Sequence, residues 1–144
     1  MTVRPRASSV DALRRMKAAR RRDTAPEIAL RRALHAQGLR FRIDHAVLAG
    51  ARRADIVFAS AKTAVFVDGC FWHCCPKHRS FPKANAAWWA EKLRMNRRRD
   101  LDTNRQLRKA GWHVERVWEH ESALKAATRI IAVIQTRTQL IHAH

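Results

Sequence analysis

Residues 54–68 read Ala54-Asp-Ile-Val-Phe-Ala-Ser-Ala-Lys-Thr-Ala-Val-Phe-Val-Asp68, and this stretch decides the fold. It contains two apolar runs, 54–58 and 64–67, that are rich in the Val, Ile and Phe favoured by β-strands. Small and polar residues separate the runs, which predicts two strands joined by a short turn. Asp55 opens the first run and Asp68 closes the second, so a hairpin would bring both carboxylates to the same end.

Helices and further strands are predicted on both sides of this hairpin. Thr24 and Glu27 have capping-box spacing ahead of a helix of about fourteen residues that ends at Gly38. The other predicted elements are a strand over 41–43, a helix over 86–110 capped by Asn85 and stopped by Gly111, a strand over 112–118, and an amphipathic helix over 123–141 that uses Leu124, Ile130, Ile131 and Ile134. This order favours an α/β fold with a mixed central β-sheet flanked by helices.

The charge of the chain predicts a polyanionic partner. Thirty Lys and Arg against 12 Asp and Glu give a formal net charge of +18 over 144 residues, a length typical of one domain. The sequence has neither an apolar run of about 18 residues nor a signal-peptide pattern, which favours nucleic acid over a membrane surface. We expect a basic N-terminal arm over 1–22, either ordered by DNA or a solvated tail, and a single domain over 23–144.

All three cysteines lie in the segment 69–78, Gly-Cys-Phe-Trp-His-Cys-Cys-Pro-Lys-His. An odd number of crowded thiols suits a metal in a reducing compartment, so we expect a cytoplasmic, nucleoid-associated protein. Cys70, Cys75 and His78 together are typical of a tetrahedral zinc site. The fourth ligand is open between Cys74 and His120, which would reach the segment if its strand is a neighbour. Alternatively, the cysteines are small core residues.

Two acids and a histidine suggest phosphodiester chemistry. Asp55 and Asp68 at one sheet edge would hold Mg²⁺, and His73 would act as general base on a water molecule. In the alternative interpretation both acids are strand-end caps, and His73 is a zinc ligand or a surface residue. For Glu27 the pattern alone favours helix capping over a role in holding a metal-bound water.

Several aromatic residues lie close to clusters of arginine. Phe71 and Trp72 lie in the cysteine-containing segment, and Trp88 and Trp89 are adjacent at a helix start, so one of each pair cannot face the same core. Exposed flat side chains near Arg97, Arg98 and Arg99 are typical of a wedge between stacked bases. A surface for a protein partner would use the same aromatic residues but would not need the excess of arginine. Trp112 and Trp118 alternate with valines and are expected in the core.

An ordered set of motifs gives the chain a family resemblance. They are Asp23-Thr-Ala-Pro-Glu27, Ala54-Asp-Ile-Val-Phe58, Val65-Phe-Val-Asp-Gly-Cys-Phe-Trp-His73, Trp89-Ala-Glu-Lys92 and Gly111-Trp-His-Val-Glu-Arg-Val-Trp-Glu119. The set resembles the very-short-patch repair endonucleases, whose fold is restriction-endonuclease-like. The resemblance implies a monomeric, Mg²⁺-dependent enzyme with a structural Zn²⁺ that nicks double-stranded DNA 5′ to the thymine of a T·G mismatch. Mismatch-repair proteins are candidate further partners.

The resemblance also assigns roles to individual residues. Asp55 matches the catalytic aspartate that binds Mg²⁺ together with the carbonyl of Val67, and His73 matches the histidine near the attacking water. Glu27 matches an acid that holds metal-bound waters, which overturns the preference for capping alone, although both roles can coexist. The remaining matches are the zinc ligands Cys70, Cys75, His78 and His120, and the aromatic wedge of Phe71, Trp72 and Trp89.

Three departures from the family pattern stand out. The loop before the catalytic aspartate reads Ala49-Gly-Ala-Arg-Arg-Ala54 in place of Pro-Gly-x-Pro, and His120 stands where the fourth zinc ligand is commonly Cys. Asp68 stands where the best-known members have histidine, so its role as metal ligand, hydrogen-bond partner or second base is open. Two other functions compete: a zinc-stabilised DNA-binding protein without catalysis, and a nuclease of the same fold with another lesion or sequence specificity.

Overall fold

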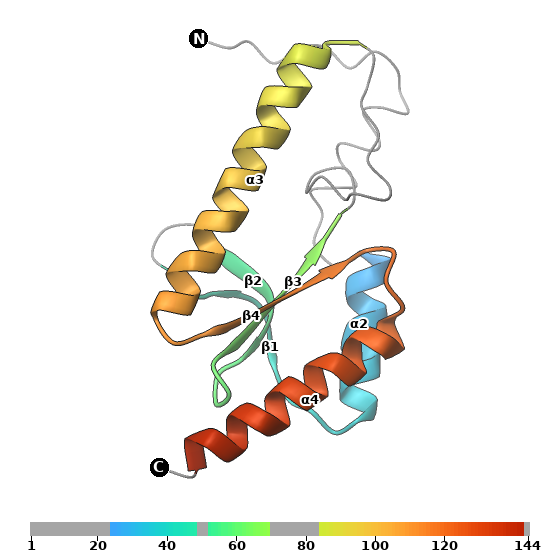
Figure 1. The fold of residues 1–144 in the computed structure, drawn as a ribbon. Coiled ribbons are helices and arrows are strands. Elements are labelled where there is room, and N and C mark those ends of the chain that lie inside the picture. Colours follow the sequence, from blue (N-terminus) through green and yellow to red (C-terminus); the bar gives the residue numbers. More distant parts are fainter. Residues whose placement is uncertain (1–23, 49–51, 70–83, 143–144) are drawn as a thin grey trace.

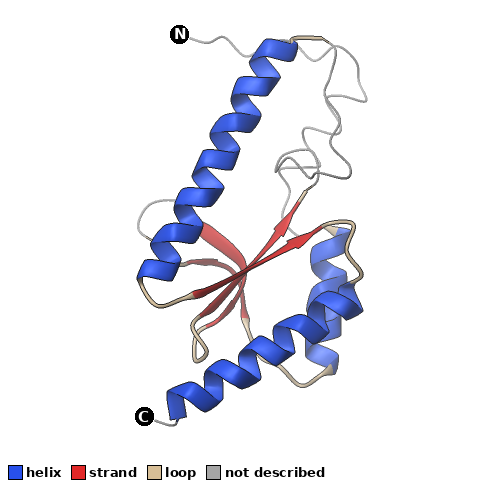
Figure 2. Cartoon of the chain, in the orientation of Figure 1, coloured by secondary structure: helices blue, strands red, loops and turns tan. Residues whose placement is uncertain are grey.

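The computed structural model describes residues 24–48, 52–69 and 84–142, which form one mixed sheet and three helices (Figures 1 and 2). The elements in chain order are α2 (Ala25–Ala36), β1 (Arg42–Ala46), β2 (Arg53–Phe58), β3 (Thr63–Asp68), α3 (Ala86–Lys109), β4 (His113–Trp118) and α4 (Ala123–His142). The sheet has the order β1-β2-β3-β4. The mixed α/β class is therefore confirmed, while the predicted arm over 1–22 lies outside the described residues.

The predicted hairpin is the centre of this sheet. β2 and β3 pair antiparallel with Ile56 opposite Val65, whereas β3 and β4 pair parallel with Asp68 opposite Trp118. β1 adds to the outer edge of β2, antiparallel, and it is longer than the predicted strand over 41–43. Because β3 and β4 are parallel neighbours, both end at the same edge of the sheet, where the Glu119 N–H donates to the Asp68 carbonyl at 2.9 Å.

Apolar side chains cover both faces of the sheet. On one face a cluster that includes Leu30, Ile56, Val65 and Ile130 packs the sheet against α2 and α4. On the other face α3 contributes Leu107 to the second cluster, whose further members are Ala54, Val57, Ala64, Phe66 and Val114. Figure 1 shows that only the C-terminal part of α3 lies against the sheet, and that its N-terminal half extends beyond it.

Two of the helices end as the sequence predicts. Gly38 and Gly111 follow α2 and α3 with φ of 80° and 88°. In each case the residue after the glycine donates its N–H to a carbonyl five residues back, Leu39 to Leu34 at 3.2 Å and Trp112 to Leu107 at 2.9 Å. This is the Schellman arrangement, which requires the left-handed conformation that glycine adopts without strain.

Four predictions about side chains are wrong. Thr24 and Asn85 occupy the N-cap positions of α2 and α3, but neither side chain makes a capping hydrogen bond, and Asn85 adopts a left-handed conformation. Leu124 is 73% exposed although it shares a face of α4 with Ile131, which packs against the core; Leu124 lies in the first turn of the helix. Trp118, expected in the core, is only half-buried.

None of the described helices has the length and apolarity needed to cross a membrane.

The two leucines of α3 provide a matched test of this packing. Leu107 is 0% exposed and Leu101 is 56% exposed. We expect Leu107→Ala to lower the free energy of unfolding by about 2–5 kcal/mol, since it leaves a cavity in the second cluster. Leu101→Ala should change it by less than about 0.5 kcal/mol. Urea unfolding followed by circular dichroism measures both, and equal losses would contradict the placement of α3.

Candidate active site at the end of the central hairpin

Asp55 lies near the start of β2 and is held there by the backbone of the neighbouring strand. The Val67 N–H donates a hydrogen bond of 2.7 Å to Asp55 Oδ2. Within 24–48, 52–69 and 84–142, no Lys, Arg or His side chain forms an ion pair with Asp55. The hairpin therefore holds this carboxylate in one position without neutralising it.

The surroundings of Asp55 disfavour its negative charge. The pKa of Asp55 is raised from 3.8 to about 6, chiefly by burial and to a smaller extent by the negative charges of Glu27 and Asp68. The Val67 N–H and the positive charge of Arg31 act in the opposite direction and lower the pKa of Asp55. A carboxylate in such surroundings is stabilised by a proton or by a cation, and strongly shifted carboxylates of this kind are typical of functional sites.

Glu27 is directed into the fold. Its side chain is buried on α2, and Arg31, one helical turn later, donates a hydrogen bond of 3.2 Å from Nη2 to Glu27 Oε2. Because the Thr24 side chain makes no capping hydrogen bond, the capping box predicted from the pattern is not formed. The burial of Glu27 and its effect on the pKa of Asp55 place it beside the candidate site.

Asp68 is a hydrogen-bond partner of Arg116. Arg116 Nη1 donates to both carboxylate oxygens of Asp68, at 2.9 and 3.1 Å, and the Asp68 side chain is only 5% exposed. Of the three roles that the sequence left open for Asp68, these contacts support the hydrogen-bond partner. A carboxylate engaged through both oxygens has less freedom to bind a metal or accept a proton.

The oxygen donors at Asp55 are of the kind that Mg²⁺ prefers. The described residues contain no group of three or more His, Cys, Asp or Glu side chains that could hold a metal ion. Mg²⁺ needs no such group, since it is bound by one or two carboxylates and keeps several waters. The Asp55 carboxylate and the backbone of Val67 are adjacent, as their hydrogen bond shows. His73, the predicted general base, lies outside the described residues.

The predicted zinc site is described only at His120. Cys70, Cys75 and His78 lie outside the described residues, as does Cys74. The condition for His120 to approach them is met, because β4 is the parallel neighbour of β3 and the Glu119 N–H donates to the Asp68 carbonyl at 2.9 Å. The exposed His120 ring stacks on Trp118, with ring centroids 6.4 Å apart.

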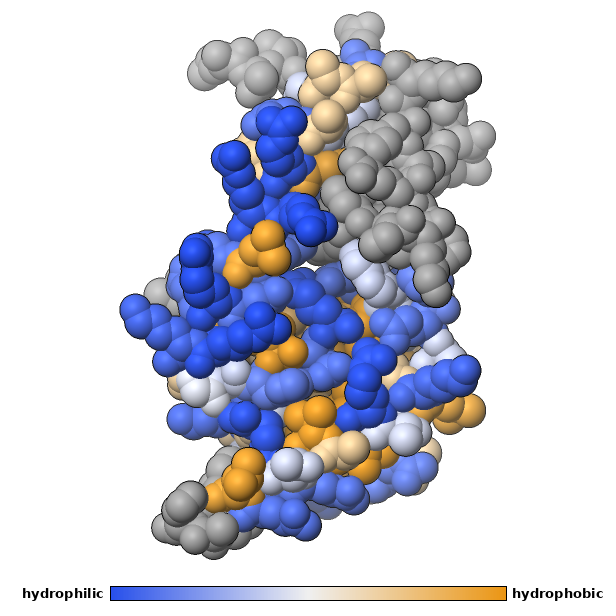
Figure 3. Space-filling model, viewed as in Figure 1, coloured by the Kyte–Doolittle hydropathy of each residue, from blue (hydrophilic) through white to orange (hydrophobic). Residues whose placement is uncertain are grey.

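The described DNA-binding candidates lie on α3. Arg97, Arg98 and Arg99 are all exposed, on a largely hydrophilic surface over this helix (Figure 3). Trp89 is 7% exposed and packs edge-on against Trp88 at 4.8 Å, so insertion between bases would first have to uncover it. Phe71 and Trp72 lie outside the described residues.

Sequence reasoning missed the two arginines that neutralise the flanking acids. Arg31 follows Glu27 by four residues, a helical ion-pair spacing that could have identified it. Arg116 is 48 residues from Asp68, so only the pairing of β3 with β4 brings them together. No local signal predicts this pair.

The raised pKa of Asp55 makes the stability of the fold depend on pH in a defined direction. The folded-state pKa, about 6, exceeds the ordinary value of 3.8, so stability falls as pH rises through this window. In buffer without Mg²⁺ we expect Asp55→Asn to be more stable than the natural chain at pH 8, by up to about 3 kcal/mol, and to lose this advantage at pH 3.5. Urea unfolding at both pH values measures the difference.

Asp102→Asn is a control that should change the stability at pH 8 in the opposite direction. Hydrogen bonds from Arg52 and Arg105 hold the pKa of Asp102 below its ordinary range, so its loss should destabilise the protein at pH 8. An Asp55→Asn variant that is no more stable than the natural chain at pH 8 would show that the Asp55 charge is not disfavoured.

Comparison with known proteins assigns the chain to a family. Residues 10–79 match the family of the DNA mismatch endonuclease Vsr. The type II nicking enzyme V.NaeI of Lentzea aerocolonigenes is 47% identical over 132 residues, which cover 90% of this chain and 78% of that protein. V.NmeAIP of Neisseria meningitidis is 40% identical over 110 residues (75% and 76%), and the DNA mismatch endonuclease Vsr of Escherichia coli K12 is 38% identical over 108 residues (72% and 66%). The chain belongs to the Vsr family of DNA mismatch endonucleases.

Proposed function

We propose that the protein is a Mg²⁺-dependent endonuclease that nicks one DNA strand at T·G mismatches. Membership of the Vsr family makes it a DNA endonuclease and implies the restriction-endonuclease-like fold. The observation that carries the finer proposal is the carboxylate of Asp55, held at the hairpin end with a pKa raised to about 6 and with two further acids nearby. A divalent cation bound at such a carboxylate would stabilise its negative charge.

The residues around Asp55 have separate roles in this reaction. Asp55 and the carbonyl of Val67 would hold Mg²⁺, which when bound stabilises negative charge on the scissile phosphate and increases the acidity of water. Glu27 orients a water molecule from α2, and Arg31 fixes the Glu27 carboxylate for that purpose. His73 takes the proton of the attacking water, a role suited to its ordinary pKa near neutrality.

DNA binding uses charge and aromatic side chains together. The exposed Arg97, Arg98 and Arg99 contact phosphates, and the net charge of +18 supports binding to a duplex. Phe71 and Trp72 wedge beside the mismatched pair, at a cost in stacking of a few kcal/mol that phosphate contacts offset. Trp89 would join the wedge only after a local rearrangement, because it is buried.

A structural Zn²⁺ supports the segment that carries His73. Cys70, Cys75 and His78 would be its ligands, with His120 as the fourth, and Cys74 would be a spectator. The position of His120 two residues after the end of β4, the parallel neighbour of β3, supports this ligand set. The protein would act as a monomer in the cytoplasm, where thiolates remain available to the metal.

A second candidate is a nicking enzyme of the same family with another lesion or sequence context. The relatives V.NaeI and V.NmeAIP are named type II nicking enzymes, whereas the E. coli relative is named a DNA mismatch endonuclease. Both candidates share the chemistry at Asp55 and differ only in the DNA that is deformed. A panel of duplexes with single mismatches in several flanking contexts separates them, since only the first candidate requires T·G.

Replacing Asp55 tests the reaction itself. We expect Asp55→Asn to abolish Mg²⁺-dependent nicking of a T·G duplex, a loss of at least about 1,000-fold, because the amide cannot hold the cation. Duplex binding should stay within a few-fold of the natural chain. A denaturing gel measures nicking and fluorescence anisotropy measures binding.

The control for this change is Asp44→Asn, which makes the same charge change on β1 beside β2. It should retain nicking. Persistent nicking by Asp55→Asn would remove Asp55 from the mechanism, and tight binding without nicking by the natural chain in Mg²⁺ would favour a DNA-binding protein without catalysis.

Replacing His120 tests the zinc site. We expect the purified protein to contain about one zinc per chain. His120→Ala should lower that content and the melting temperature, since it removes one of four ligands. Elemental analysis by mass spectrometry measures the metal. His113→Ala is the control because His113 lies in β4 and pairs with Glu115, and it should retain zinc. A full zinc content in His120→Ala would exclude His120 as a ligand.

A further inference from the structure

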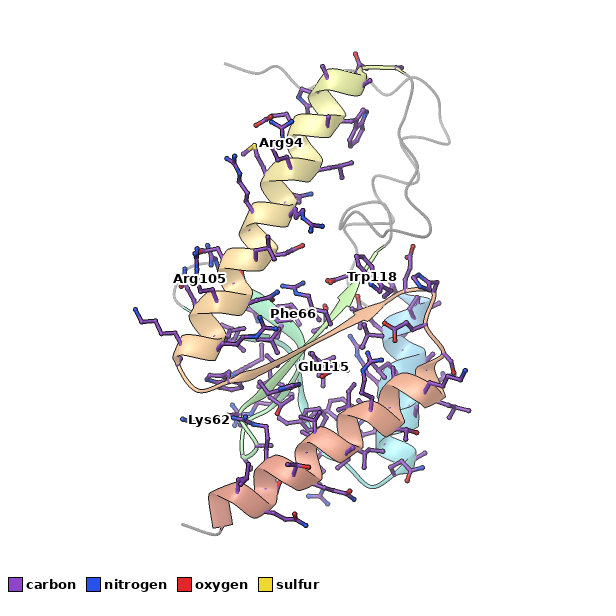
Figure 4. All side chains as sticks on the ribbon, in the orientation of Figure 1. Lys62, Phe66, Arg94, Arg105, Glu115 and Trp118 are labelled. Atoms are coloured by element: carbon purple, nitrogen blue, oxygen red, sulfur yellow. The ribbon has the colours of Figure 1, made fainter. Side chains whose placement is uncertain are left out.

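Arg116 joins three elements of the fold at one guanidinium group. From β4 it donates to Asp68 at the end of β3 and, through Nε, to Asn104 Oδ1 on α3 at 2.8 Å. Nη2 lies 3.5 Å from the carbonyl oxygen of Asp100, and Nη1 lies 3.8 Å from its carboxylate. The guanidinium carbon also lies 4.3 Å from the centre of the Phe66 ring. Phe66 is labelled in Figure 4.

These contacts fix the direction of the Arg116 side chain. A planar guanidinium has donors in a fixed fork, so acceptors on two sides define its orientation as well as its position. Arg116 is 20% exposed and Asp68 is 5% exposed, which protects the pair from solvent. A partly buried pair of this kind is weak evidence for stability, but it does hold its partners in one arrangement.

The partners of Arg116 connect α3, whose arginines are proposed to bind DNA, to the edge of the sheet near Asp55. Asn104 and Asp100 lie one and two helical turns before Leu107, the α3 residue packed in the second cluster. Asp100 directly follows the exposed Arg97–Arg99 segment. At the other end, Asp68 adjoins Val67, whose N–H holds Asp55. Arg116 therefore links the part of α3 that begins to leave the sheet with the strand that positions Asp55.

We propose that Arg116 is a positioning residue that fixes the Arg97–Arg99 segment of α3 relative to the active-site strand β3. This inference rests on the proposed nuclease function. Through these contacts of Arg116, a duplex bound by α3 is held in a fixed position relative to the Asp55 carboxylate. Arg116 therefore affects the rate of nicking more than the affinity for DNA. Asn104 lies on α3, which carries none of Glu27, Asp55 and Asp68, and this makes it the cleanest of the Arg116 partners to test.

The first test changes Arg116 itself and Asn104, the α3 residue that accepts its Nε hydrogen bond. Asn104→Leu removes the acceptor for Arg116 Nε at similar size, whereas Asn104→Asp keeps an acceptor at the same place. We expect Asn104→Leu and Arg116→Met to lower the single-turnover nicking rate on a T·G duplex in Mg²⁺ by about 10- to 100-fold. Asn104→Asp should retain the rate of the natural chain. The dissociation constant for the duplex should change less than about 3-fold in all three variants.

Arg137→Met is the matched control. Arg137 also makes two hydrogen bonds from its guanidinium, to the carbonyls of Ala61 and Gly111 at 2.6 Å each, but these join turns of the chain and do not involve Asp68. Its loss should lower the melting temperature without lowering the nicking rate of folded protein. A purely structural Arg116 would behave like Arg137, and that result would overturn the inference.

Hydrogen exchange provides a readout that is independent of activity. In Arg116→Met and Asn104→Leu, amides over 96–104 of α3 should exchange faster, with little change in β2 and β3. Unchanged exchange would overturn the inference even if nicking were lost. If the natural chain nicks none of the duplexes, the proposed function fails, and faster exchange over 96–104 would still support the tie between α3 and β3.

Discussion

The hydrogen bond from the Val67 N–H to the Asp55 carboxylate is the constraint on which the candidate site depends. It joins the two central strands of the sheet, so the position of the acid is set by hairpin register and backbone geometry. The same bond keeps the carboxylate where burial disfavours its charge. The fold thereby creates a buried carboxylate that a proton or a cation stabilises. The chemistry of the site thus depends on the packing of the hairpin.

The three acids near this point are not equivalent. Glu27 has Arg31 as a partner, and Asp68 has Arg116, whereas Asp55 has a backbone N–H and the repulsion of the other two acids. Arginines neutralise the flanking charges, and the unbalanced charge is concentrated at one carboxylate. Where chemically similar groups have different surroundings in one site, they typically have different roles in its chemistry. This difference supports the proposal that Asp55 binds the cation and that Glu27 orients a water molecule.

The sequence predicted local features well and distant partners poorly. The hairpin, the helix-ending glycines and the order of elements depend on near neighbours, and the structure confirms them. Helix caps at Thr24 and Asn85 failed because a cap requires a particular rotamer and backbone conformation, which residue type alone does not fix. The pair of Asp68 and Arg116 depends on which strands become neighbours, and no short-range pattern encodes that choice.

The length of α3 explains why polar ties matter in this fold. Its 24 residues span about 36 Å, whereas the six-residue strands beneath it span about 20 Å, so the helix must overhang the sheet. Apolar packing through Leu107 anchors one end, but it cannot by itself fix the direction of the part that carries Arg97–Arg99. A directional contact near the residues where α3 leaves the sheet can fix that direction, because hydrogen bonds constrain angle as well as distance. Arg116, between Asn104 and Asp68, stands at that point.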